Sequence, residues 1–99
     1  FLIFFYYMNI AKIRGKLDNI DRKIVKLVAK RVALIPAIAE YKKENKLPIH
    51  NAKREKTIFE SKRRLESELN VNPDLVEDIF KRLIEESYNI EELIIKKKK

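Results

Sequence analysis

The chain has 99 residues, with 23 Lys and Arg against 15 Asp and Glu, and a formal net charge of +8. It contains no Cys and a single His, His50, which excludes disulfides, thiolate metal sites, a cysteine nucleophile and multi-histidine metal sites. One Gly and three Pro leave little material for turns, so we expect one small domain built from a few long helices. A chain of this size buries a modest core, and oligomerisation is a natural source of further stability.

Residues 1–7 are all apolar or aromatic. A transmembrane helix needs ~20 apolar residues, and a secretory signal begins with a basic region, so this segment fits neither. We interpret residues 1–7 as an extension ahead of Met8. A short interfacial anchor is the less favoured alternative, because no amphipathic pattern supports it. We therefore expect a cytoplasmic protein with no membrane partner.

An apolar stripe with a repeat of three and four residues runs through residues 10–43 and predicts one long helix. Pro36 is expected to bend this helix around residues 32–36, because proline removes a backbone donor. A helix of some 30 residues is ~45 Å long, whereas a compact domain of this size has a radius of gyration of only ~13 Å. Two shorter helices cannot cover such a stripe, so a second copy of the chain is the simplest cover.

A second helix is expected from residue 49 or 51 to residue 69. A third is expected after Asn72 and Pro73, which form a good N-cap and first-turn pair. Residues 8–95 are predicted to be the folded domain. Residues 96–99, all Lys, carry four of the positive charges and are predicted to be a disordered tail.

Charged residues in register with the apolar stripes are candidates for a binding site. Arg31 and Lys42 are eleven residues apart, which places them on one face of a helix, ~16 Å apart, where they could hold a small dianion. Most Lys and Arg on helices are simply solvated, so spacing alone gives only a hint of an anion pocket. Polar residues also share a face, at a spacing of three or four, on the other two predicted helices: Asn51, Arg54 and Glu55 on the second, and Ser87 and Glu91 on the third.

The order and separation of these residues resemble the all-helical (AroQ-type) chorismate mutase family along residues 10–93. No single piece is specific, but all of them occur in the family's order. The matching pieces are Ile13 and Arg14, Leu17 and Asp18, Ile20 and Asp21, Ile24 and Val25, Leu27 and Val28, Arg31, Lys42, the run from Pro48 through Asn51 to Arg54 and Glu55, the run from Leu83 to Ser87, and Glu91.

The resemblance implies an all-α fold with three helices per chain, a long first helix and an intertwined six-helix homodimer. It implies an isomerase that converts chorismate to prephenate, by a Claisen rearrangement, in phenylalanine and tyrosine biosynthesis. The family uses no cofactor, no metal and no covalent intermediate. Such a reaction needs a substrate held in a compact chair-like conformer, with donors aimed at the ether oxygen as negative charge builds on it.

The resemblance also implies a set of contacts to the substrate carboxylates. Arg14 and Arg31 would bind them, Lys42 would contact a carboxylate and the ether oxygen, and Ser87 would assist a carboxylate. Arg14 lies seventeen residues before Arg31, so it is ~25 Å away and rotated by about 100° on the same helix. Both cannot clasp one small molecule from one chain, which agrees with the family's use of the first arginine in the partner's site.

The remaining implied contacts involve the ring hydroxyl and the ether oxygen. Asn51 and Glu55 would meet the ring hydroxyl, Arg54 would shape the pocket beside them, and Glu91 would donate to the ether oxygen. Asn51 stands where the family commonly has Asp. Glu91 stands where many members have Gln, and a Glu donates a hydrogen bond only when it is protonated.

The competing hypothesis is a non-enzymatic basic helical module that binds nucleic acid. The net charge and the Lys tail favour it. Against it, the sequence has no nucleic-acid motif, and acidic residues are spread through all three predicted helices. We therefore expect no nucleic-acid partner.

Overall fold

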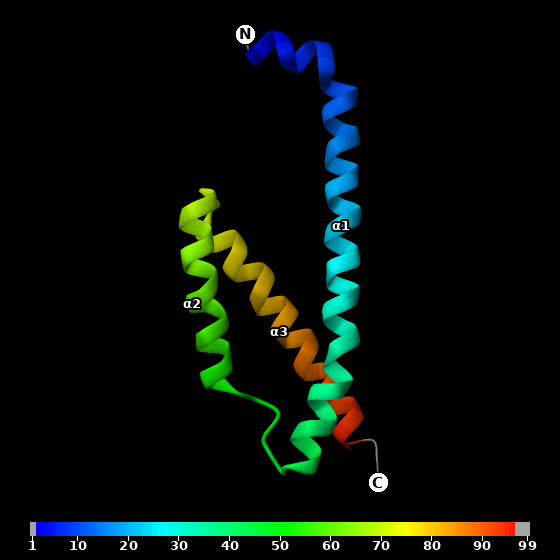
Figure 1. The fold of residues 1–99 in the computed structure, drawn as a ribbon, viewed down its shortest axis with the longest axis vertical. Coiled ribbons are helices and arrows are strands. Elements are labelled where there is room, and N and C mark those ends of the chain that lie inside the picture. Colours follow the sequence, from blue (N-terminus) through cyan, green and yellow to red (C-terminus); the bar gives the residue numbers. More distant parts are fainter. Residues whose placement is uncertain (1, 97–99) are drawn as a thin grey trace. The chain divides into compact units, whose positions relative to one another are not determined.

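The computed structural model describes residues 2–96, with side chains from Asn9 onward, and every regular element among them is a helix (Figure 1). The helices are α1 (Leu2–Glu44), α2 (Ala52–Leu69) and α3 (Pro73–Lys96). The predicted all-α class and its three helices are confirmed. The chain divides after Ala33 into two compact units, here called the N-terminal unit (residues 2–33) and the C-terminal unit (residues 34–96). Within residues 2–96, no helix is both long and apolar enough to cross a bilayer.

The N-terminal unit contains a break at Asn9 that the sequence analysis did not predict. Asn9 has φ −127° and ψ 21°, outside the helical region. The blue, N-terminal part of α1 bends in Figure 1. The break separates the apolar segment before Met8 from the helix that follows. Pro36, in contrast, lies inside α1, and Asn9 remains the one residue of this helix with non-helical dihedral angles. The bend expected around Pro36 stays a prediction.

Most of the apolar stripe of the N-terminal unit is exposed. Leu27 is 63% exposed, and four further residues of the predicted stripe also face solvent: Leu17, Ile20, Ile24 and Val28. Contiguous apolar surface of this kind is rare on soluble monomers, because exposing it to water is unfavourable.

The N-terminus of α2 is fixed by a cap. Asn51 is the N-cap residue, and its Oδ1 accepts a hydrogen bond from the backbone N–H of Arg54 at 3.0 Å. This contact satisfies one of the donors that the first turn of a helix leaves unpaired. Asn70 ends α2 in the left-handed conformation, with φ 56°. Asn tolerates this region better than most residues do.

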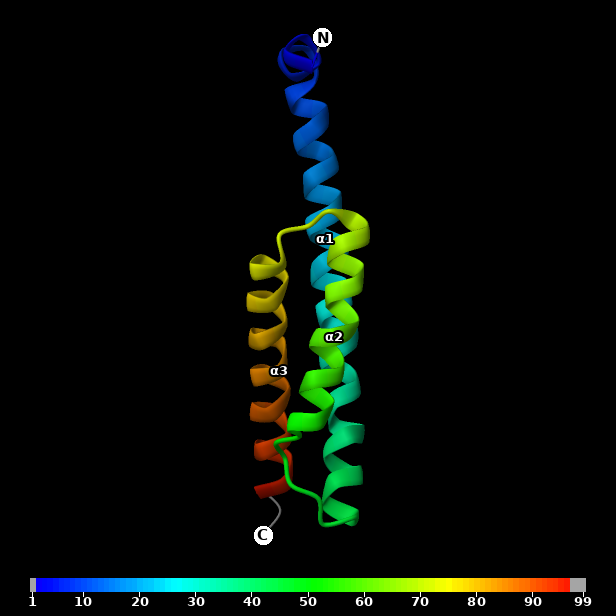
Figure 2. The ribbon, with the colours of Figure 1, turned by 90° about the vertical axis from the view of Figure 1, so that its left-hand side faces the viewer.

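Asn72 caps α3 as predicted. Its Oδ1 accepts a hydrogen bond from the backbone N–H of Asp74 at 2.9 Å, and Pro73 is the first helical residue. The helices α2 and α3 then run side by side in the C-terminal unit (Figure 2). Lys96, assigned to the tail by the sequence analysis, is the last residue of α3, and residues 97–99 lie outside the described residues.

The core of the C-terminal unit is small and half polar. Its buried apolar residues are Ile35 and Ala39 on α1 and Ile84 on α3. Three polar residues are buried as deeply: Lys42, Ser87 and Glu91. Soluble domains rarely bury a Lys and a Glu unless the two charges are paired.

The cap of α3 generates a test of the fold. We expect Asn72→Ala to lower the free energy of unfolding by about 1 kcal/mol, because it leaves a first-turn N–H without its partner. Chemical denaturation followed by circular dichroism measures this change. The control is Asn89→Ala, a change of the same type at an exposed position inside α3, which should be neutral or slightly stabilising. Equal effects of the two substitutions would contradict the role of the cap.

Candidate functional site

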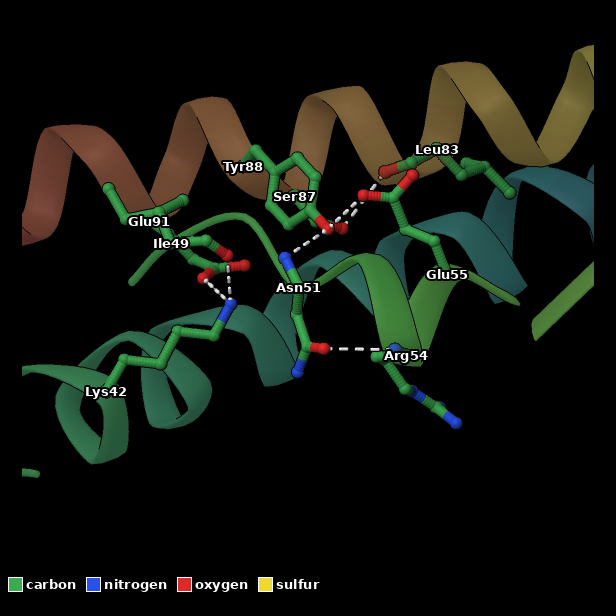
Figure 3. A network of polar contacts seen from close by, with 9 residues as sticks. All are labelled: Lys42, Ile49, Asn51, Arg54, Glu55, Leu83, Ser87, Tyr88 and Glu91. Carbon is green, nitrogen blue, oxygen red and sulfur yellow. Dashed lines mark hydrogen bonds and ion pairs between the residues drawn. The ribbon is translucent and has the colours of Figure 1, made fainter. Parts of the chain in front are cut away.

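The centre of the site is an ion pair between α1 and α3. Lys42 Nζ lies 2.6 Å from Glu91 Oε1, and the side chains are 10% and 3% exposed (Figure 3). Lys42 Nζ also donates a hydrogen bond, at 2.5 Å, to the backbone carbonyl of Ile49. Ile49 lies in the connector, residues 45–51, between α1 and α2. Lys42 is thus held between the connector and α3.

Glu91 keeps hydrogen-bonding capacity despite this pairing. Its Oε1 is buried and accepts no hydrogen bond of good geometry from the described residues, although Lys42 lies within ion-pair distance. A buried carboxylate oxygen normally has hydrogen-bond partners, because losing hydration without replacement is costly. The arrangement places a cation and a carboxyl group side by side in the interior.

Ser87 lies one turn before Glu91 on the same face of α3. Ile84, Ser87 and Glu91 are the buried residues of this helix, at spacings of three and four. The Ser87 hydroxyl donates a hydrogen bond to the carbonyl of Leu83 at 3.0 Å. The predicted pairing of Ser87 and Glu91 on one face is therefore present, and that face is buried.

The start of α2 carries Asn51, Arg54 and Glu55, as the sequence predicted. Asn51 uses its side-chain oxygen for the cap, which leaves its amide group as a donor. Arg54 contributes its backbone N–H to that cap, and its side chain is exposed. Glu55 is half-buried, and its Oε2 accepts a hydrogen bond from Tyr88.

Tyr88 connects these groups, and the sequence analysis missed it. Its hydroxyl donates to Glu55 Oε2 at 2.6 Å and accepts from the backbone N–H of Asn51 at 3.1 Å (Figure 3). Its ring centroid lies 4.5 Å from that of His50 and 5.4 Å from Lys42 Nζ, within the range of a cation–π contact. Burial, followed by the hydrogen bond to Glu55, raises the pKa of Tyr88. The phenol therefore stays protonated, and a donor, at neutral pH.

Arg14 and Arg31 belong to the N-terminal unit. Arg14 is exposed and Arg31 is half-buried. The other six predicted site residues lie in the C-terminal unit. There Lys42 and Glu91 are paired, Ser87 shares the buried face of Glu91, and Tyr88 links Asn51 to Glu55. The roles of the two arginines stay predictions.

The comparison with known proteins assigns the family. The sequence model of chorismate mutase type II matches residues 13–92. The chain is 43% identical over 77 residues to a chorismate mutase of Methanocaldococcus jannaschii, and the alignment covers 78% of each chain. It is 35% identical over 83 residues to the T-protein of Enterobacter agglomerans, which covers 84% of this chain and 22% of that protein.

A longer relative gives the same result. The chain is 35% identical over 89 residues to a bifunctional chorismate mutase/prephenate dehydratase of Buchnera aphidicola, which covers 90% of this chain and 23% of that protein. The chain thus spans less than a quarter of the length of these two larger relatives. No solved structure gives a significant match. The family model covers most of the chain, including every polar residue of the site just described, and the chain belongs to the type II chorismate mutase family.

Proposed function

We propose that this protein catalyses the rearrangement of chorismate to prephenate. The observation that carries the proposal is the buried pair of Lys42 and Glu91, since it places a cation and a carboxyl group together in a site from which water is largely excluded. Electrostatic stabilisation of developing charge is strongest in such a site, because the donors are already oriented and poorly screened. Membership of the type II chorismate mutase family supports the same reaction.

In this proposal, three residues hold the carboxylates of the substrate and the ether oxygen. Lys42 leaves Glu91 and donates to the ether oxygen and to one carboxylate of the substrate. Arg31 binds the same end of the substrate, and Ser87 assists. Holding both carboxylates keeps the chain of the substrate folded over its ring, which is the reactive conformer, and removes much of the entropic part of the barrier.

Glu91 is proposed to donate a second hydrogen bond to the ether oxygen. A carboxyl group donates only while it holds a proton. The arrival of a dianion next to Glu91, and the turning of Lys42 toward that dianion, both favour the neutral carboxylic acid. In this proposal Glu91 holds a proton in the complex with the substrate.

A homodimer is proposed to complete the site. The exposed apolar stripe of the N-terminal unit needs a cover, and a second copy of the same stripe provides one through two-fold symmetry. Pairing of the long helices would carry Arg14 of each chain to the site of its partner. The result is the intertwined dimer expected from the sequence, with two equivalent sites.

The direct test of this function is the consumption of chorismate by the purified protein. Prephenate should form at a rate that is proportional to protein concentration and insensitive to metal chelators. The proposal would be refuted if folded, dimeric protein did not accelerate the rearrangement of chorismate above its spontaneous rate. Salt-dependent binding to duplex DNA in such a protein would instead favour the nucleic-acid alternative.

Comparison of Lys42 with Lys96 tests the role of Lys42, because each of the two lysines pairs with a Glu on α3. We expect Lys42→Ala to reduce kcat by roughly 10²–10³-fold, because it removes a donor aimed at developing charge. Lys96 pairs with Glu92 at 2.5 Å, but both side chains are largely exposed, so Lys96→Ala should leave kcat unchanged. Steady-state kinetics on protein shown to be folded by circular dichroism measures both. Equal losses would mean that bulk positive charge, not a positioned donor, drives the reaction.

The proton on Glu91 predicts a pH dependence. Turnover should fall as pH rises, because the acid form of Glu91 is lost. Glu91→Gln supplies a permanent amide donor of similar shape, so its activity should persist to higher pH. Profiles of kcat against pH for the two proteins provide the measurement. Superimposable profiles from mildly acidic to mildly basic pH would show that Glu91 is not the protonated donor.

The shared site predicts complementation between inactive variants. Arg14→Ala and Arg31→Ala should each be nearly inactive alone. A mixed dimer places both lesions in one site and leaves the other intact, so mixing and re-equilibrating the two variants should restore part of the activity. Sedimentation must show dimers at micromolar concentration, and mass spectrometry must show the mixed species. Mixed dimers without recovered activity, or a well-folded monomer, would contradict the shared site.

A further inference from the structure

The Tyr88 hydroxyl occupies a position that suits a ligand hydroxyl. It donates to a carboxylate oxygen of Glu55 and accepts from the backbone N–H of Asn51 (Figure 3). A hydroxyl group is among the few groups that can donate and accept at once from one atom. Glu55 and Asn51 are also the residues expected to meet the ring hydroxyl of the substrate. The Tyr88 hydroxyl thus bonds to the acceptor, Glu55 Oε2, and to the donor, the Asn51 N–H, that the ring hydroxyl of the substrate would use.

The backbone N–H of Asn51 needs a partner from outside α2. An N-cap residue precedes the helix, so its own N–H has no carbonyl within the helix to bond. Tyr88 supplies that partner here. A ligand hydroxyl could take over the contact without leaving the donor unsatisfied, since one hydroxyl replaces another. The exchange therefore conserves hydrogen bonds.

The ring of Tyr88 has space to move into. A pocket of about 390 Å³ adjoins Tyr88 and is lined mainly by polar side chains, including His50, Lys81, Asn89 and Glu92. Tyr88 is only half-buried, and its ring contacts on this side are with the exposed His50. Glu55 lines this pocket too. Rotation of the Tyr88 side chain within the pocket would therefore break the shared contact of its hydroxyl with Glu55 and Asn51 while the ring remained partly covered.

The geometry points to Tyr88 as a specificity-determining residue whose hydroxyl fills the subsite for the ring hydroxyl of the substrate until the substrate displaces it. The inference rests on the proposed function, because it takes chorismate as the ligand. A ligand that carries a hydroxyl opposite its carboxylates regains both hydrogen bonds on displacing Tyr88. A ligand without that hydroxyl can bind with the Tyr88 hydroxyl still in place, because it uses neither of these two hydrogen bonds.

The size of the effect follows from the occupancy of the subsite. The apparent dissociation constant equals the intrinsic one divided by the fraction of protein that is competent to bind. If the Tyr88 hydroxyl holds the subsite about nine times in ten, the apparent affinity is weakened roughly tenfold. Removing the hydroxyl removes this competition while the ring is retained.

The test uses Tyr88→Phe, with Tyr41→Phe as the matched control on an exposed tyrosine. We expect Tyr88→Phe to lower KM for chorismate by roughly 3–10-fold, with the change confined to KM. Tyr41→Phe should keep the KM of the wild type. A chorismate analogue in which hydrogen replaces the ring hydroxyl serves as a second probe. Its inhibition constant should change less between wild type and Tyr88→Phe than KM does, because it competes for no hydrogen bond with Tyr88.

The outcomes separate the two proposals. Wild-type protein that does not consume chorismate refutes the proposed function and this inference with it. Active wild type with an unchanged or raised KM in Tyr88→Phe overturns the inference alone. A fall in kcat at constant KM would do the same, because it would mean that Tyr88 holds Glu55 in place during the reaction. Circular dichroism of both variants shows that the comparison is between folded proteins.

Discussion

The buried contact between Lys42 and Glu91 is the interaction on which the rest of the site depends. Neither charge is stable in the interior by itself, since an unpaired buried charge typically costs several kcal/mol. Each therefore requires the other, and the contact ties the last turns of α1 to the last turns of α3. The bond from Lys42 to the carbonyl of Ile49 adds the connector, which in turn sets where α2 begins. A pair of this kind contributes little net stability compared with an apolar pair of the same shape, so its presence at the centre of a small core points to use rather than to packing.

The small core of the C-terminal unit and the exposed stripe of the N-terminal unit have one explanation in our account, which is association with a second copy of the chain. The C-terminal unit buries few apolar side chains, and those of the N-terminal unit face solvent. A single copy of the chain therefore has an incomplete core by the standards of soluble domains. In our account the second copy completes both the core and the catalytic site. Folding, association and the assembly of the active site would then be one process, and the stability of the protein would depend on its concentration.

Sequence reasoning predicted the features that depend on local chemistry. The periodicity of apolar residues predicted the three helices, and Asn72 with Pro73 predicted the start of α3, because capping and helix periodicity are encoded within a few residues. The break at Asn9 was missed, since no proline or glycine marks it. Tyr88 was missed for a different reason. Its partners are Glu55, 33 residues away, and Asn51, 37 residues away, so only the packing of α3 against the start of α2 brings them together. The pairing of Lys42 with Glu91 likewise needed the fold, although both residues were candidates from the start.

The central claim is that the buried pair opens when a dianion binds and that Glu91 carries a proton in the complex. Carbon-13 NMR of glutamate labelled at the side-chain carboxyl reports this directly, with Glu91→Gln used to assign the resonance. The account predicts that the Glu91 resonance lies upfield, at the position of a protonated carboxyl, once a stable dicarboxylate mimic of the transition state has saturated the site at neutral pH. A Glu91 resonance that stays at the carboxylate position while the mimic saturates the site would contradict the account.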